Sequence, residues 1–183
     1  MEIEKTKIEG LIILKPKIFG DDRGYFIEAY KNSFFKKHLP NVEFEQLNES
    51  KSAKGVLRGL HFQKSPFAQT KLCWVVVGEV LDVAVDLRKG SLTYGQHVSV
   101  RLSEHNKKQL LIPRGFAHGF VVLSDYAIFQ YLVDNPYSKE HEGSIVYNDE
   151  ELNIDWEIDP KLIILSERDK ISKKFNNLKI QKI

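Results

Sequence analysis

Short runs in which apolar and polar residues alternate recur along most of this chain, and this period constrains its fold more than any other feature. Residues 80–87 and 96–102 are clear examples, with an apolar side chain at every second position. In a β-strand, alternate side chains lie on opposite faces. About ten such runs occur, separated by turn residues at intervals of roughly 8–12 positions, and helical periodicity is scarce. The pattern predicts an all-β domain, built as an antiparallel sandwich or barrel.

The expected elements can be placed on the sequence. Strands are expected over residues 11–14, 24–30, 42–50, 56–63, 71–77, 80–87, 96–102, 110–112, 116–122 and 127–133. A turn cluster occupies residues 19–24, and a short helix is expected over residues 32–38, before Pro40. The lysine-rich residues 170–183 are expected to form a terminal helix with a solvated basic face. No repeat or linker divides the chain, so residues 1–183 are predicted to form a single domain.

Size and charge limit the classes of function. The chain of 183 residues is long enough for one well-formed core. Its 27 basic and 25 acidic residues give a net charge of +2, which indicates no nucleic-acid partner. No apolar run reaches the roughly 18–20 residues of a membrane span, and the N-terminus lacks a signal core, so no membrane partner is expected. The single cysteine, Cys73, forms no disulfide within the chain, which fits a cytoplasmic location, and it is expected to be a buried small apolar residue.

The run over residues 42–50 predicts a pocket. On one face, the apolar residues Val42 and Phe44 are followed by Gln46, Asn48 and Ser50. An inward face that changes from apolar to hydrogen-bonding side chains indicates a core that opens into a cavity. An ordinary edge strand with polar ends is the alternative.

Three basic side chains lie within apolar strands that follow. Arg58 and His61 interrupt the run over residues 56–63, and Lys71 opens the run over residues 71–77. On neighbouring strands they would form a cationic, proton-handling cavity. Alternatively, Arg58 and Lys71 are exposed and His61 is a structural histidine. In an unbroken strand Arg58 and His61 face opposite sides, so either a bulge at Gly59 or a bend of Arg58 round an edge is needed to bring them together.

Seven segments in series carry a family resemblance. They are residues 19–28 (FGDDRGYFIE), 46–50 (QLNES), 55–63 (GVLRGLHFQ), 69–72 (QTKL), 82–88 (DVAVDLR), 113–120 (PRGFAHGF) and 165–169 (LSERD). Each segment alone is weak evidence, and their order in series makes the match specific. Together they resemble the dTDP-4-dehydrorhamnose 3,5-epimerase family, a branch of the cupins, over about residues 10–170.

The resemblance implies a cupin-type jelly-roll barrel of antiparallel strands with a few short helices, mainly C-terminal. It also implies a homodimer with strand exchange that binds a dTDP-linked 4-keto-6-deoxyhexose. The expected reaction inverts C3 and C5 of dTDP-4-dehydro-6-deoxy-D-glucose to give dTDP-4-dehydro-L-rhamnose, in dTDP-rhamnose biosynthesis. The family uses neither a metal nor another cofactor, so none is expected here.

The chemistry of this reaction gives roles to four residues. A ketone at C4 makes the protons on C3 and C5 removable, because the resulting carbanion delocalises as an enolate. His61 suits the base, and Asp169 is the family-matched carboxylate that would fix its tautomer. Tyr131 suits the acid on the opposite face of the sugar, and Lys71 suits the cation beside the enolate oxygen.

Further residues are expected to bind the substrate. Arg58 and Arg23 suit the diphosphate, since a guanidinium forms bidentate hydrogen bonds with phosphate. Family matching adds the pocket residues Gln46, Asn48, Gln63, His118, Glu142 and Arg168. It also implies that Arg23, Phe26 and Glu28 reach into the site of the partner subunit. The remaining histidines, His38, His97, His105 and His141, are expected to be solvated.

Three competing functions stay open. A metal-dependent cupin would use His118, which follows Pro113-x-Gly115 as in metal-binding cupins. However, Gln63 stands where a second histidine is usual and Lys71 would repel a cation. The alternative for His118 is a retained structural histidine. A non-catalytic sugar-binding jelly roll would need neither acid nor base, and a third possibility is an enzyme that epimerises only C3 or only C5, or acts on another nucleotide sugar. Departures from the family at residues 147–150 and at Arg168 touch neither the proposed acid nor the base.

Overall fold

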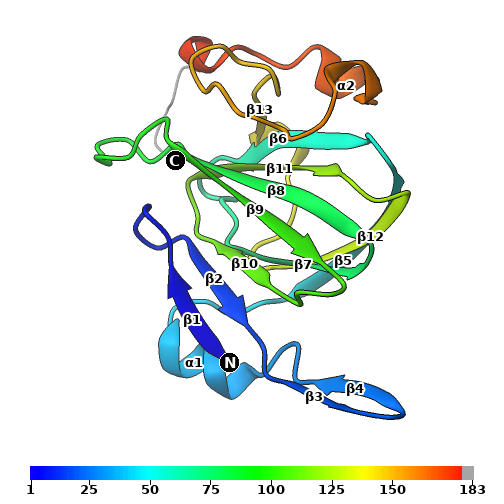
Figure 1. Ribbon diagram of the computed structural model, residues 1–183. Coiled ribbons are helices and arrows are strands. Elements are labelled where there is room, and N and C mark those ends of the chain that lie inside the picture. Colours follow the sequence, from blue (N-terminus) through cyan, green and yellow to red (C-terminus); the bar gives the residue numbers. More distant parts are fainter. Residues whose placement is uncertain (179–183) are drawn as a thin grey trace.

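The structure is a computed structural model that describes residues 1–178 (Figure 1). The strands are β1 (Glu2–Lys5), β2 (Ile12–Lys15), β3 (Ile18–Asp21), β4 (Gly24–Ile27), β5 (Gln46–Ala53), β6 (Leu57–Gln63), β7 (Lys71–Val77), β8 (Glu79–Asp86), β9 (His97–Ser103), β10 (Gln109–Ile112), β11 (Phe116–Val122), β12 (Tyr126–Val133) and β13 (Glu142–Ser144). The helical segments are short: α1 (Asn32–His38), η1 (Lys139–His141), η2 (Pro160–Leu162), α2 (Glu167–Lys170) and η3 (Phe175–Asn177). Within residues 1–178, the named strands pair only in antiparallel fashion.

Two sheets face each other across the main core. The six-stranded sheet has the order β1-β2-β10-β7-β12-β5, and the five-stranded sheet has the order β13-β6-β11-β8-β9. Apolar side chains from both sheets meet between them, among them Val75 and Phe129 from the first sheet and Ala84 and Phe120 from the second. Alternate residues of each strand point into this core, as the period of two predicts. The all-β jelly-roll architecture expected from the sequence is therefore confirmed.

The C-terminal segment covers the outer face of the five-stranded sheet (Figure 1). There, Leu81 and Val121 pack in one cluster with Trp156 and Phe175. As a result, β8 and β11 are buried on both faces. This double burial explains why Asp82, on the inner face of β8, is completely buried.

The β3–β4 hairpin forms a small separate sheet that projects away from the two main sheets (Figure 1). Its strands are largely exposed, including Phe26. Lys107 Nζ donates to Tyr25 Oη of the hairpin at 2.6 Å, and Gln109 Nε2 donates at 2.8 Å to the carbonyl of Ala29, two residues after β4. In the single chain the hairpin therefore presents apolar surface to solvent.

Most of the expected elements are confirmed, including the helix over residues 32–38, but some bounds are wrong. The strand expected over residues 24–30 ends at Ile27, and the strand expected over residues 42–50 begins only at Gln46. The continuous helix expected from residue 170 onward is also wrong over residues 171–178. There Phe175 is buried in the cluster under the five-stranded sheet, and Lys173 forms a bridge with Ile145, which requires extended backbone. The rest of that expected helix, residues 179–183, lies outside the described residues.

Burial matches most of the expectations for single residues. Cys73 is buried, and His38 and His105 are exposed. His97 and His141 are half-buried, so the expectation that they are solvated is wrong. Burial and the nearby Lys7 lower the pKa of His97, and the Nδ1 of His141 lies 2.8 Å from the Ser138 hydroxyl. Within residues 1–178, no helix is both long and apolar enough to cross a bilayer.

Candidate active site

A cavity of about 530 Å³ lies beside α2, with walls from β5, β6, β7, β11 and β12. A second hollow of about 350 Å³ adjoins it, because His61, Lys71 and Tyr131 line both. The two hollows therefore lie next to each other, with these three side chains at the junction, and together they are called the groove below. His61 comes from the five-stranded sheet, whereas Lys71 and Tyr131 come from the six-stranded sheet. The groove thus has an imidazole on one wall and an ammonium and a phenol on the other.

His61 on β6 forms a hydrogen-bonded pair with Asp169 on α2. His61 Nε2 lies 2.6 Å from Asp169 Oδ1, and the Asp169 side chain is only 4% exposed. Ser166 holds the carboxylate from its other side: its Oγ donates to Asp169 Oδ2 at 2.8 Å and accepts from the Asp169 N–H at 3.1 Å. Burial raises the pKa of Asp169, but the hydrogen bonds from His61 and Ser166 outweigh this effect and hold the pKa below its usual value. The expected imidazole–carboxylate pair is present, and its carboxylate is ionised at neutral pH.

A bulge in β6 brings Arg58 and His61 to the same groove. The register between β6 and β11 shifts between the two residues, so β6 carries one extra residue there. Gly59 permits this shift, because its φ is +123° and a Cβ atom on it would lie 2.5 Å from Gly119 Cα. The bulge, and not a bend round an edge, is therefore the correct alternative. Arg58 itself stays largely exposed in the groove wall, where its Nε donates to Ser52 Oγ at 3.1 Å.

Lys71 on β7 and Tyr131 on β12 lie side by side. Lys71 Nζ is 5.6 Å from the centre of the Tyr131 ring. Burial lowers the pKa of Lys71, although Cys73, Asp82 and Glu142 act in the opposite direction. Burial raises the pKa of Tyr131, so this phenol keeps its proton at neutral pH. A protonated phenol can return a proton to a carbanion, and a buried ammonium can stabilise a negative oxygen.

Amide side chains line the second hollow, as the pattern over residues 42–50 predicts. On β5, Gln46 Nε2 donates to Asn48 Oδ1 at 2.7 Å, and Ser50 on the same strand lines the first hollow. Gln63 is buried in the wall, and its Oε1 accepts from the Ser138 N–H at 3.1 Å. The amide-rich face therefore lines a cavity as expected, and β5 is at the same time the edge strand of the six-stranded sheet.

A charged cluster forms one rim of the groove. Arg168 Nη2 pairs with Glu142 Oε1, and Tyr137 Oη donates to Glu142 Oε2 at 2.7 Å. Arg168 and Glu142 were expected here, whereas sequence reasoning missed Tyr137, which lies in an irregular loop with no periodic signal. It also gave no role to Ser166, although the spacing Ser166-x-x-Asp169 is a helix-capping signal that the sequence does contain.

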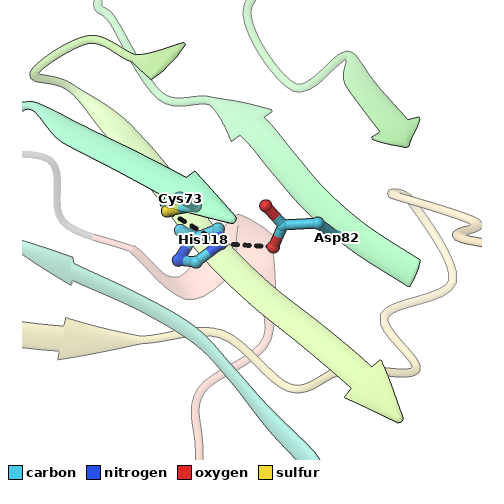
Figure 2. A group of neighbouring side chains, drawn as sticks. All are labelled: Cys73, Asp82 and His118. Atoms are coloured by element: carbon cyan, nitrogen blue, oxygen red, sulfur yellow. Dashed lines mark hydrogen bonds and ion pairs between the residues drawn. The ribbon is translucent and has the colours of Figure 1, made fainter. Parts of the chain in front are cut away.

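His118 on β11 lines the first hollow and belongs to a buried cluster with Cys73 and Asp82 (Figure 2). Its Nε2 lies 2.5 Å from Asp82 Oδ1 and 3.9 Å from Cys73 Sγ. Thiol, carboxylate and imidazole are all groups that bind transition metals, and one atom from each lies within 4.8 Å of the others. However, Lys71 is two residues before Cys73 on the same face of β7, and its positive charge disfavours a divalent cation beside it.

Arg23, Phe26 and Glu28 lie outside this groove, on or next to the β3–β4 hairpin. Arg23 pairs with Asp21 of the same hairpin, and Glu28 pairs with Lys31. Phe26 is 64% exposed. Their contribution to the site of a partner subunit stays a prediction.

Comparison with known proteins identifies the family. The sequence model of the dTDP-4-dehydrorhamnose 3,5-epimerases matches residues 5–177. The chain belongs to this family. The dTDP-4-dehydrorhamnose 3,5-epimerase of Shigella flexneri is 52% identical to it over 176 residues, which is 96% of each chain. The crystal structure of a dTDP-6-deoxy-D-glucose-3,5-epimerase from Legionella pneumophila, in complex with dTDP-4-keto-L-rhamnose, covers 97% of this chain and 94% of that one, with a TM-score of 0.92 and 48% identity. The chain is therefore an isomerase of the epimerase type.

A more distant relative shows that the fold alone does not determine how many carbons are inverted. A 3′-monoepimerase from Streptomyces bikiniensis, in complex with dTDP-quinovose, matches 92% of this epimerase and 85% of its own chain, with a TM-score of 0.84 and 31% identity. Inversion of one carbon and inversion of two are therefore compatible with the same architecture. The higher identity to the 3,5-epimerases favours inversion of both carbons in this family member.

Proposed function

We propose that this epimerase inverts C3 and C5 of dTDP-4-dehydro-6-deoxy-D-glucose and so gives dTDP-4-dehydro-L-rhamnose, a step in dTDP-rhamnose biosynthesis. One observation carries the proposal: His61 and Tyr131 line the same groove from opposite sheets, and Lys71 lies with them where the two hollows meet. Inversion at a carbon requires a base on one face of the sugar ring and an acid on the other.

His61 removes the proton from the carbon next to the ketone. Because Asp169 occupies Nε2, the nitrogen left to take this proton is Nδ1. The ionised carboxylate, 2.6 Å away, stabilises the imidazolium that forms. The electron pair delocalises onto the C4 oxygen as an enolate, and the buried ammonium of Lys71 stabilises that oxygen.

Tyr131 returns a proton to the opposite face of the ring, which completes the inversion. Its raised pKa suits this role, because the phenol holds its proton until the carbanion takes it. One proton leaves the carbon and one arrives, so the sugar is neither oxidised nor reduced. The step therefore requires no redox cofactor.

The nucleotide occupies the polar parts of the groove. Arg58 pairs with the diphosphate, and the other contacts to the substrate, sugar included, come from Gln46, Asn48, Gln63, His118, Glu142 and Arg168. The β3–β4 hairpin of a second copy adds Arg23, Phe26 and Glu28, so the active form is a homodimer with strand exchange. The exposed apolar surface of the hairpin supports this assembly, because such surface is commonly covered by a partner. A cytoplasmic location fits the free thiol of Cys73.

Proton NMR of dTDP-4-keto-6-deoxyglucose with the enzyme in heavy water tests the proposal. Deuterium is expected at both C3 and C5, and a coupled reductase should trap a sugar inverted at both carbons. His61→Ala should abolish exchange while dTDP still binds, and unchanged exchange in this variant would remove His61 from the mechanism. Exchange at one carbon alone would show that the enzyme epimerises only that carbon. Exchange at neither carbon would indicate a non-catalytic sugar-binding protein.

A further inference from the structure

Asp82 is a buried carboxylate beside the groove that the proposed mechanism does not use. It lies within β8 and is completely buried. Its Oδ1 is 2.5 Å from His118 Nε2, and its Oδ2 has no hydrogen-bond partner among residues 1–178. An ionised carboxylate in such a place is costly unless a donor or a cation compensates it. The only hydrogen bond to this side chain in the described part of the chain comes from His118, so the two residues act as a unit.

This contact determines which nitrogen of His118 faces the substrate. An ionised carboxylate can only accept, so with Asp82 ionised the proton of the pair lies on His118 Nε2. The other ring nitrogen, Nδ1, lies on the side of the ring away from Asp82 (Figure 2), and the ring lines the first hollow of the groove. A carboxylate that binds one imidazole nitrogen fixes the tautomer and the orientation of the ring, and so defines what the other nitrogen offers.

The groove therefore holds two oriented imidazoles next to each other. His61 and His118 are direct partners in the register of β6 and β11. Each has its Nε2 bound by a buried carboxylate, Asp169 from α2 for the first and Asp82 from β8 for the second. In both pairs Nδ1 is the nitrogen left for the sugar. The same arrangement thus occurs twice, once for the base and once for a group that contacts the substrate.

We propose that Asp82 is a positioning residue, which holds His118 with its proton on Nε2 so that Nδ1 is presented to the sugar. This inference rests on the proposed function, in which His118 contacts the substrate. The titratable groups around the pair are Cys73 and Lys71 on β7, His61 on β6 and Tyr131 on β12. Asp82 is also one of the negative groups whose charge favours the protonated form of Lys71.

The tautomer of His118 can be measured without any substrate. In protein labelled with ¹⁵N-histidine, NMR of the ring nitrogens reports which one carries the proton, and His118→Gln identifies the signals of this residue. Wild-type protein should show His118 protonated at Nε2. Asp82→Asn keeps the shape of the side chain and removes its charge, so it should shift the His118 signals, alter the pH dependence of kcat/KM and lower kcat/KM by roughly 10- to 100-fold.

Asp86→Asn is a matched control. Asp86 lies on the same strand and is also completely buried, but its hydrogen bonds go to Arg88, Ser91 and Thr93, and it does not line the groove. This variant should be less stable, yet its His118 signals should not move.

The possible outcomes separate the positioning role from the proposed function. A wild-type His118 protonated at Nδ1 would overturn the inference, even if Asp82→Asn does not fold. Unchanged His118 signals in a folded Asp82→Asn variant would also overturn it. Shifted signals with unchanged kcat/KM would refute the presentation of Nδ1 to the sugar. If the wild-type protein has the expected tautomer but exchanges no proton of the keto sugar, the proposed function fails while the Asp82–His118 geometry stands.

Discussion

Asp169→Asn tests the His61–Asp169 pair most directly. The substitution keeps the size of the side chain and removes its charge, at a position that is 4% exposed and 2.6 Å from the imidazole. A hydrogen bond to a charged group contributes about 1.5–3 kcal/mol. Since about 1.4 kcal/mol corresponds to a factor of ten in rate, deuterium exchange at C3 and C5 should slow by roughly 10- to 150-fold.

The assay compares initial exchange rates by proton NMR in heavy water, at saturating keto sugar. Ser166→Ala is a graded companion, because it removes the hydrogen bond from a neutral hydroxyl to Asp169 but leaves the carboxylate and its contact with His61, so the expected loss is smaller, about 2- to 10-fold. Asp159→Asn is the control, since Asp159 caps η2 and does not line the groove. Its rate should stay within about twofold of wild type. If Asp169→Asn also stays within about twofold, the role of the carboxylate is refuted.

Four further predictions follow from the same geometry. Tyr131→Phe should slow epimerisation more than proton exchange, and equal losses in the two NMR assays would argue against an acid role. Burial raises the pKa of Asp86, but its hydrogen bonds, chiefly from Arg88, bring it to about 2, below the usual 3.8. The carboxylate therefore contributes about 2 kcal/mol of stability above pH 4 that is lost as the pH falls towards 2, so urea unfolding curves of wild type and Asp86→Asn should converge in acid. Gly59→Ala should lower both stability and activity, because its methyl group would lie 2.5 Å from Gly119 Cα, and a stable, fully active variant would contradict the account of the bulge. Metal analysis should find no stoichiometric metal in active enzyme, whereas one bound ion per chain would revive the metal-dependent alternative.

The architecture was predictable because strand periodicity is a local signal. The alternation in β8 is visible in any short window, and it identifies the strand correctly. It misleads about burial, however. Apolar residues such as Leu81 lie on one face of β8, so the alternation predicts that Asp82, on the other face, is exposed to solvent. Asp82 is in fact completely buried. The reason is that β8 packs on both sides, with the second sheet on one face and the C-terminal segment on the other. No local pattern reports that second covering layer.

The site residues also differ in how far the sequence alone predicts them. His61 and Lys71 stand out in the sequence, because a charged or titratable side chain inside an apolar run needs a reason to be there. Asp169 does not stand out, and only the family resemblance assigned it to His61. Tyr137 lies in an irregular loop, so its place at the rim depends on tertiary structure alone. The helix expected from residue 170 onward is wrong over residues 171–178 for a related reason, since the burial of Phe175 determines the path of the chain there.

The base and its carboxylate are separated by 108 positions along the chain. On a ribosome, β6 emerges long before α2, so a nascent chain whose sheets have begun to associate still carries an unassisted imidazole. Proton abstraction at full rate has to await the docking of α2, because this helix carries Asp169. A chain that ends just before Asp169 would accordingly keep the strands of both sheets in its sequence, and it should abstract protons no faster than the Asp169→Asn variant.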